Sequence, residues 1–86
     1  MMTSDPQIGA AAVKTEDDRK LEQLSGRQRE VLQRIADGQN TKQIASAMGI
    51  TVKTVEAHRL RVMRRLQIDN VVGLVRFALR TGLVSL

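Results

Sequence analysis

The sequence contains no cysteine, tryptophan or tyrosine, and Phe77 is its only aromatic residue. Without cysteine the chain has no disulfide framework, no thiol nucleophile and no thiolate metal site. The single histidine, His58, also argues against a histidine-rich metal site. Modules that bind single-stranded nucleic acid by stacking bases need aromatic platforms, so this composition argues against RRM and OB domains.

Long apolar segments are missing as well. No uninterrupted apolar run approaches the ~20 residues that a helix needs to span a bilayer. The N-terminus has no basic stretch followed by an apolar core, so it does not resemble a signal peptide. We therefore expect a cytoplasmic protein with no membrane partner.

The length of 86 residues allows one small domain at most. A domain of this size has a thin core, and most catalytic folds with a deep cleft do not fit in it. No pair of carboxylates, metal-ligand cluster or nucleophile–base pair stands out, and His58 has no acidic partner at a useful helical spacing. We expect no enzyme, no catalytic residue, no cofactor and no metal.

Charge divides the chain into two parts. Residues 1–24 carry three basic and five acidic side chains, whereas residues 25–86 carry eleven basic and four acidic ones. We expect a leader over 1–24, disordered over residues 1–13 and either a short helix or an extended lead-in over 14–24. A basic module behind an acidic leader favours a polyanionic partner, although many domains are basic for solubility alone.

Capping signals and apolar periodicity predict an all-α fold of four helices within residues 25–86. An S-x-x-Q and an N-x-x-Q capping box begin the first two helices after Ser25 and Asn40, and Gly38 and Gly49 end them. Asn70 caps the last helix. The predicted helices span about 26–37, 41–48, 51–66 and 71–81.

Apolar residues recur at helical spacing and define the expected core. In the first three helices these are Val31, Leu32, Ile35, Ala36, Ile44, Ala45, Met48, Val55, Val62 and Leu66. In the fourth helix Val71, Leu74, Val75 and Ala78 are expected to face the core, which leaves Val72, Leu79 and part of Phe77 on a second face. Unless the leader or the C-terminal tail covers this face, it predicts self-association.

The second and third predicted helices have the spacing of a helix-turn-helix. Ala45 is small where the two helices approach each other, and Gly49 follows at the turn, where the backbone needs a positive φ. Ile50 is expected to fill the core from the turn, and Val55 to face back into it. Each of these positions has a steric reason for its residue type.

The third predicted helix has a basic outer face. One stripe along it contains Lys53, Glu56, Ala57, Leu60, Arg61 and Arg64, with Arg59 and Arg65 on the flanks. A helix in the major groove presents such residues to base edges while its flanking cations hold phosphates. Glu56 is suited to accept from a cytosine amino group and Ala57 to contact a thymine methyl. The alternative is a solvated basic face on an ordinary helix.

Three segments of the sequence match one known pattern in order. LSGRQREVL over 24–32, GQNTKQIA over 38–45 and ITVKTVEAH over 50–58 resemble the GerE/LuxR-type DNA-binding domain. The resemblance runs from Leu24 to Leu83, and the segments TVEAHR and LVRFALRTGL are similar to the FixJ-like response-regulator branch in particular.

This resemblance implies a transcription regulator that binds double-stranded DNA as a homodimer. Carried over by position, the base-facing candidates are Glu56, Ala57 and Leu60, with Lys53 alongside. The phosphate-contacting candidates are Lys42, Thr54, His58, Arg59 and Arg61, and the dimer candidates are Val72, Arg76 and Leu79. An activator of this kind would also contact RNA polymerase.

The sequence departs from the family pattern at several positions. Glu56 stands where many members have lysine, which removes one cation from the groove face. Val71 and Val72 replace the arginine that usually follows the cap of the fourth helix. The 86 residues contain no receiver or ligand-binding domain, so the chain is either a stand-alone regulator, which its initial Met favours, or the output domain of a longer protein.

Two other functions fit parts of the sequence. A protein-interaction module would pair with another regulator through the fourth helix and change that regulator's DNA binding. A promoter reader similar to region four of sigma factors shares the capping and helix-turn-helix pattern, but the fourth helix and its GLV ending argue against it.

Overall fold

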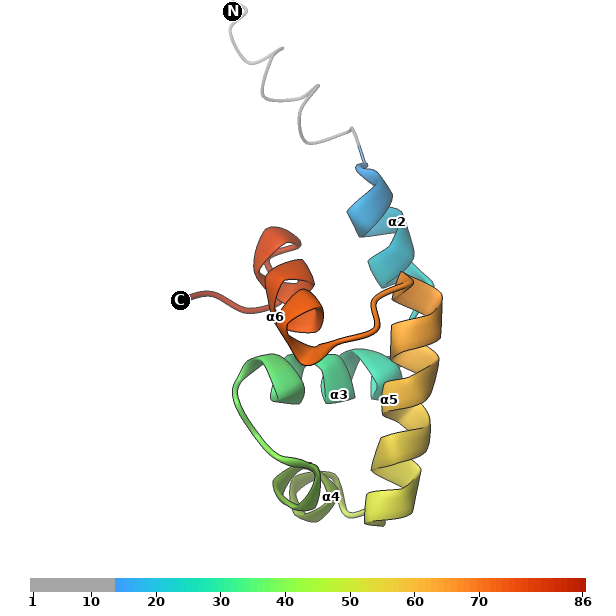
Figure 1. The fold of residues 1–86 in the computed structure, drawn as a ribbon, viewed down its shortest axis with the longest axis vertical. Coiled ribbons are helices and arrows are strands. Elements are labelled where there is room, and N and C mark those ends of the chain that lie inside the picture. Colours follow the sequence, from blue (N-terminus) through green and yellow to red (C-terminus); the bar gives the residue numbers. More distant parts are fainter. Residues whose placement is uncertain (1–13) are drawn as a thin grey trace, which may run out of the picture.

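The computed structural model describes residues 14–86, and this part of the chain is helical without any strand (Figure 1). Its helices are α2 (Glu16–Glu22), α3 (Gly26–Ala36), α4 (Thr41–Met48), α5 (Val52–Leu66) and α6 (Val71–Arg80). The predicted all-α class and the four helices after Ser25 are confirmed. Residues 14–24 contain a helix, one of the two conformations that the sequence left open. The predicted disorder of residues 1–13 lies outside the described residues.

Each helix begins at a side chain that caps it. In α3 the Ser25 hydroxyl accepts from the Gln28 N–H at 3.1 Å, while the Gln28 side chain accepts from the Ser25 N–H at 3.0 Å. Asn40 and Gln43 form the same reciprocal pair at the start of α4, with both distances 2.8 Å. These boxes satisfy backbone donors that a helix start otherwise leaves unpaired. The remaining caps are Thr15, Thr51 and Asn70.

The helix ends differ slightly from the predicted ones. α3 ends at Ala36 and α6 at Arg80, each one residue earlier than expected, because the residue that follows serves as the C-cap. The residue that ends α5 is not a glycine, although its backbone is left-handed: Gln67 has a φ of 57°. Its N–H donates to carbonyls of the last turn of α5, which explains why the chain accepts this conformation.

The core lies where α3 packs against both α5 and α6, and α4 covers the N-terminal half of α5. The predicted core residues of α3, α4 and α5 are buried, except that Ala36 is half-buried. In α6 the prediction was partly wrong. Phe77 is 1% exposed and belongs wholly to the core, whereas Val71 is 41% exposed and Val75 is half-buried. Apolar residues surround much of α6, so periodicity alone did not fix which stripe faces inward, and the large ring occupies the buried position.

Three arginines from three different helices hold α2 against the rest of the domain. Arg29 of α3 donates to the Leu21 carbonyl at 3.2 Å, and Arg65 of α5 donates to the Gln23 carbonyl at 2.9 Å. Arg80 of α6 donates to the Asp17 carboxylate at 2.8 Å. Since α2 itself has no buried residue, these contacts and the packing of Leu21 and Leu24 fix its position.

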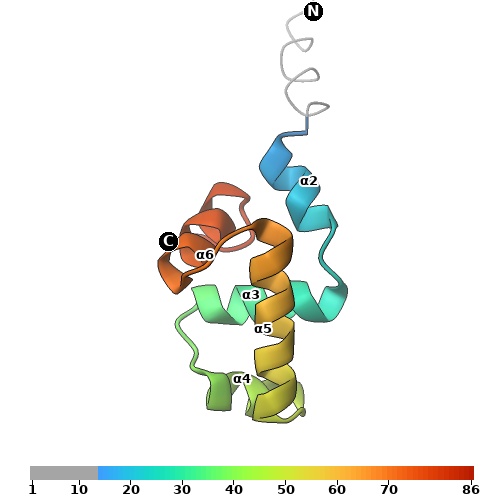
Figure 2. The same cartoon turned by 45° about the vertical axis from the view of Figure 1, so that its right-hand side comes forward.

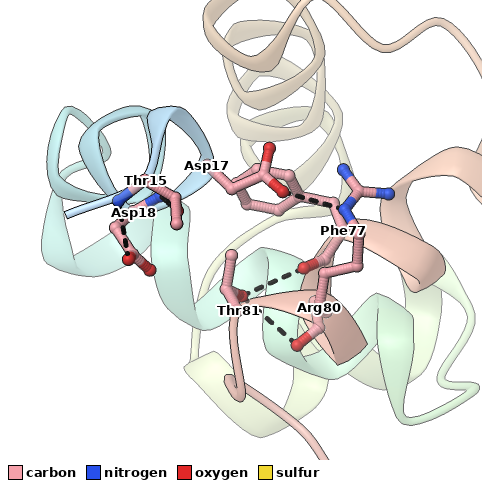
Figure 3. Close-up of polar contacts among 7 residues, drawn as sticks. Thr15, Asp17, Asp18, Phe77, Arg80 and Thr81 are labelled. Carbon is pink, nitrogen blue, oxygen red and sulfur yellow. Dashed lines mark hydrogen bonds and ion pairs between the residues drawn. The ribbon is translucent and has the colours of Figure 1, made fainter. Parts of the chain in front are cut away.

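The Asp17–Arg80 pair lies over the edge of the core (Figure 3). The Arg80 guanidinium is 5.7 Å from the centre of the Phe77 ring, a cation–π distance. The hydrogen bond and the charge of Arg80 hold the pKa of Asp17 below its ordinary value of 3.8, although desolvation opposes this shift. The pair thus joins α2 to α6.

We expect acid to release α2. A carboxylate with a lowered pKa stabilises the folded contact above its unfolded pKa, and that stability is lost as the pH falls through the lowered value. Amide hydrogen exchange in α2 should therefore accelerate below about pH 4 relative to exchange in α3. Asp17→Asn should show fast α2 exchange already at neutral pH and no such acid step. An unchanged acid step in this variant would contradict the assignment.

We also expect Gln67→Gly to stabilise the domain by about 0.5 to 1 kcal/mol, because glycine adopts a positive φ without the steric cost of a Cβ. Urea denaturation followed by circular dichroism measures the change. Gln23→Gly is the matched control, since Gln23 caps α2 with an ordinary φ of −76° and should gain nothing. Equal effects in both variants would show that the left-handed conformation is not the cause.

Candidate nucleic-acid interface

Helices α4 and α5 and the turn between them form a helix-turn-helix, and all four of its predicted steric positions are confirmed. Gly49 has a φ of 68°, as the turn requires. Ala45 and Val55 are buried, and Ile50 packs against the core from the turn. The Ile50 N–H donates to the Ala45 carbonyl at 3.0 Å, which ties the turn to α4. In both views α4 lies beside the N-terminal end of α5 (Figures 1 and 2).

The buried stripe of α5 determines which side chains face outward. Val55, Val62 and Leu66 are each 1% exposed or less, so the opposite side of α5 projects from the domain. The predicted DNA-binding residues fall into two groups. Lys42, Lys53, Thr54, Glu56, Leu60, Arg61 and Arg64 are exposed, whereas Ala57, His58 and Arg59 are half-buried.

The exposed cations of this face have no internal partners. Within residues 14–86 the ion pairs are Lys14–Glu22, Arg34–Glu30 and Arg80–Asp17, and none involves α4 or α5. The side chains of Lys42, Lys53, Arg61 and Arg64 also form no hydrogen bond with the described part of the chain. These four side chains are therefore free to bind an external anion.

Arg65 behaves differently from its neighbours. The sequence placed it on the flank of the basic stripe, but its guanidinium points to α2 and donates to the Gln23 carbonyl at 2.9 Å. That contact joins residues 42 positions apart in the chain, so no local sequence pattern predicts it. Of the three arginines in the last turns of α5, Arg61 and Arg64 remain available to a ligand and Arg65 serves the fold.

The start of α5 is organised by two threonines. The Thr51 hydroxyl accepts from the Thr54 N–H at 3.1 Å, which makes Thr51 the cap of the helix. The two hydroxyl oxygens are 2.9 Å apart and form a second hydrogen bond. Both residues are exposed, so the Thr54 hydroxyl lies at the surface beside the positive end of the helix dipole.

His58 and Arg59 lie on opposite flanks of the buried stripe. The Nδ1 atom of His58 is shielded from solvent and has no hydrogen-bond partner among the described residues. Any contact of this side chain with a phosphate must therefore use Nε2. Arg59 extends toward the loop between α3 and α4, where it lines a hollow of about 340 Å³ with Asn40, Thr41 and Val71.

The three predicted dimer residues form one stripe of α6. Val72, Arg76 and Leu79 follow each other at intervals of four and three residues, on the side opposite Leu74 and Ala78. Val72 is 61% exposed, Arg76 is exposed and Leu79 is half-buried. This stripe leaves apolar surface on the outside of α6.

Residues 14–86 contain no helix that is long and apolar enough to cross a membrane. The same residues contain no cluster of three or more histidine, aspartate or glutamate side chains that could hold a metal ion.

Comparisons with known proteins place the chain in a family. The family model described as bacterial regulatory proteins, luxR family, matches residues 22–78, from the end of α2 through most of α6. The chain is 42% identical over 64 residues to the uncharacterized response regulatory protein YgeK of Escherichia coli, covering 74% of this chain and 44% of that protein.

Two further relatives are named as regulators. Over 62 residues the chain is 42% identical to the transcriptional regulatory protein MctR of Rhizobium johnstonii and 40% identical to the oxygen regulatory protein NreC of Staphylococcus carnosus. Each alignment covers 72% of this chain and 29% of the relative, so the chain spans less than half the length of these proteins. The family consists of DNA-binding regulators of transcription and not of enzymes, and the matched residues include the helix-turn-helix of α4 and α5. The chain belongs to the luxR family of bacterial regulatory proteins.

Proposed function

We propose that this domain binds a specific sequence of double-stranded DNA as a homodimer, with α5 in the major groove and α6 joining the two copies. The observation that carries the proposal is the outer face of α5, which presents free cations opposite the stripe that anchors the helix in the core. A helix held in this way is a rigid element of the width that the major groove admits.

The distribution of side chains on α5 supports separate roles in DNA binding. Four residues on the outer side of α5, Glu56, Ala57 and Leu60 with Lys53 beside them, are suited to contact base edges. Cations and hydroxyls around them are suited to hold phosphates, which fixes the register of the helix on the duplex. This second set comprises Lys42, Thr54, His58, Arg59, Arg61 and Arg64.

The stripe of Val72, Arg76 and Leu79 supports dimerisation. A two-fold symmetric contact uses the same surface of both copies, and an exposed apolar stripe on one helix suits that arrangement. Two copies related in this way present two α5 helices to successive major grooves on one side of the duplex.

The relatives' names extend the proposal to transcription. The relatives are named as response regulatory and transcriptional regulatory proteins, and we propose that this domain regulates transcription in the cytoplasm, with RNA polymerase as a further partner when it activates. The relatives are longer than this chain, so a domain outside these residues would receive the controlling signal in a regulator of their length. A domain that acts alone would instead be controlled by its own cellular concentration.

We expect Arg61→Glu combined with Arg64→Glu to weaken binding to duplex DNA at least about tenfold at physiological salt, since phosphate contacts supply much of the affinity. The slope of log affinity against log salt should become shallower by about two per domain. Fluorescence anisotropy in a salt series measures both quantities. Arg19→Glu with Lys20→Glu is the matched control, because it changes the net charge equally but on α2.

Equal losses in both charge-reversed variants would show that only the net charge matters. Unchanged DNA binding in the α5 variant would contradict the placement of α5 in the groove. If the wild-type domain fails to bind duplex DNA and instead forms a complex with another regulator through α6, the protein-interaction alternative replaces this proposal.

We expect Val72→Glu to shift the domain toward monomer, because it places a carboxylate within an apolar contact between two copies. The side chain is 61% exposed in one copy, so the fold itself should tolerate the change. Sedimentation velocity over a concentration series, with and without duplex DNA, measures the association. Leu86→Glu is the control, since Leu86 is fully exposed at the chain end. Identical association of wild type and Val72→Glu would exclude this stripe as the interface.

A further inference from the structure

The outer face of α5 carries a carboxylate and an apolar side chain one helical turn apart. Glu56 and Leu60 are both exposed, and Leu60 leaves 55% of its surface open to solvent. Residues four positions apart are neighbours on a helix surface. The two side chains also line one hollow of about 410 Å³ on the surface, together with Arg59, Met63 and Asp69.

Neither side chain of this pair serves the fold. Within residues 14–86 no basic group forms an ion pair with Glu56, and its carboxylate takes part in no hydrogen bond. Leu60 does not belong to the hydrophobic core, whereas Met63 in the next turn of α5 packs against that core. An acid amid cations and an exposed leucine both disfavour simple phosphate binding, so the pair needs another explanation.

One base presents groups that match both side chains. In the major groove cytosine offers an amino donor at N4 beside its C5 edge. A carboxylate accepts from that amino group, and an adjacent isobutyl group contacts C5. In the major groove guanine presents only acceptors, and a carboxylate repels acceptors. Thymine presents an acceptor beside its methyl group, so it too lacks a donor for the carboxylate. Adenine presents a donor and an acceptor side by side, and this pattern suits an amide better than a carboxylate.

We propose that Glu56 and Leu60 act as one unit that specifies a cytosine in each half of the DNA site and favours that cytosine when it is methylated at C5. This inference rests on the proposed function, because it requires the outer face of α5 to lie in the major groove. The methyl group of 5-methylcytosine occupies the same position as that of thymine, next to the N4 amino group, and it adds apolar surface for Leu60 to bury.

The test uses duplexes that differ in one base pair. A selection from random duplexes first identifies the preferred site, and each position of a half-site is then varied among the four bases and 5-methylcytosine. At one position the wild-type domain should bind cytosine about tenfold more tightly than the other three bases. Methylation of this cytosine should tighten binding a further threefold or so.

Two substitutions separate the roles of the pair. Glu56→Gln should move the preference at that position from cytosine to adenine, because a glutamine amide matches the adenine N6 and N7 groups. Leu60→Ala should keep the cytosine preference and lose the gain from methylation. Glu16→Gln is the matched control, since Glu16 is exposed on α2 and its neutralisation should leave every base preference unchanged. Circular dichroism checks that each variant folds.

The outcomes distinguish this inference from the proposed function. Sequence-specific binding whose base preferences survive Glu56→Gln would overturn the inference alone, as would a methylation effect that is absent in the wild type or unchanged in Leu60→Ala. Absence of any sequence preference in the folded wild-type domain would overturn the proposed function, and the inference with it. The readout is the ratio of affinities for two duplexes, because removing one negative charge should raise the affinity for every duplex by the same factor.

Discussion

Burial of the Val55, Val62 and Leu66 stripe against α3 is the contact on which the rest of the structure depends. Because a helix repeats every 3.6 residues, burying these three side chains turns the opposite stripe of α5 outward. Separate contacts between α4 and α5, together with the left-handed turn at Gly49, hold these two helices against each other. The packing of α5 in the core therefore also determines which of its side chains face the solvent.

The arginines of α3, α5 and α6 include some that contact α2 and others that have no partner among the described residues. Arg29, Arg65 and Arg80 donate to α2 and its C-cap and thereby join α2 to α3, α5 and α6. Arg61 and Arg64 have no such partner and remain at the surface. The two groups are indistinguishable by residue type, and only the three-dimensional position of α2 separates them. This division leaves Arg61 and Arg64 without an ion-pair partner among residues 14–86, on the exposed side of α5.

The sequence predicted the parts of the domain that local chemistry determines and missed those that depend on distant contacts. Capping boxes and glycines located α3 and α4 closely, because each signal satisfies backbone groups within a few residues. The inward stripe of α6 was misjudged at Phe77 and Val71, since apolar residues on most of a helix leave its rotation to packing. The partners of Arg65 and Arg80 escaped prediction because they lie 42 and 63 positions away in the chain. The roles of Glu56 and Leu60 toward DNA stay predictions, although their exposure is consistent with them.

Selection from a random-sequence duplex library at near-physiological salt tests most directly whether α5 reads DNA. The folded domain should enrich a two-fold symmetric motif whose half-sites lie about one helical turn apart, because two α5 helices related by a dimer axis meet successive major grooves. Salt-sensitive binding without an enriched motif would contradict specific recognition by a dimer. A folded domain that recovers no duplex at all would contradict the assignment of α5 as a DNA-binding helix.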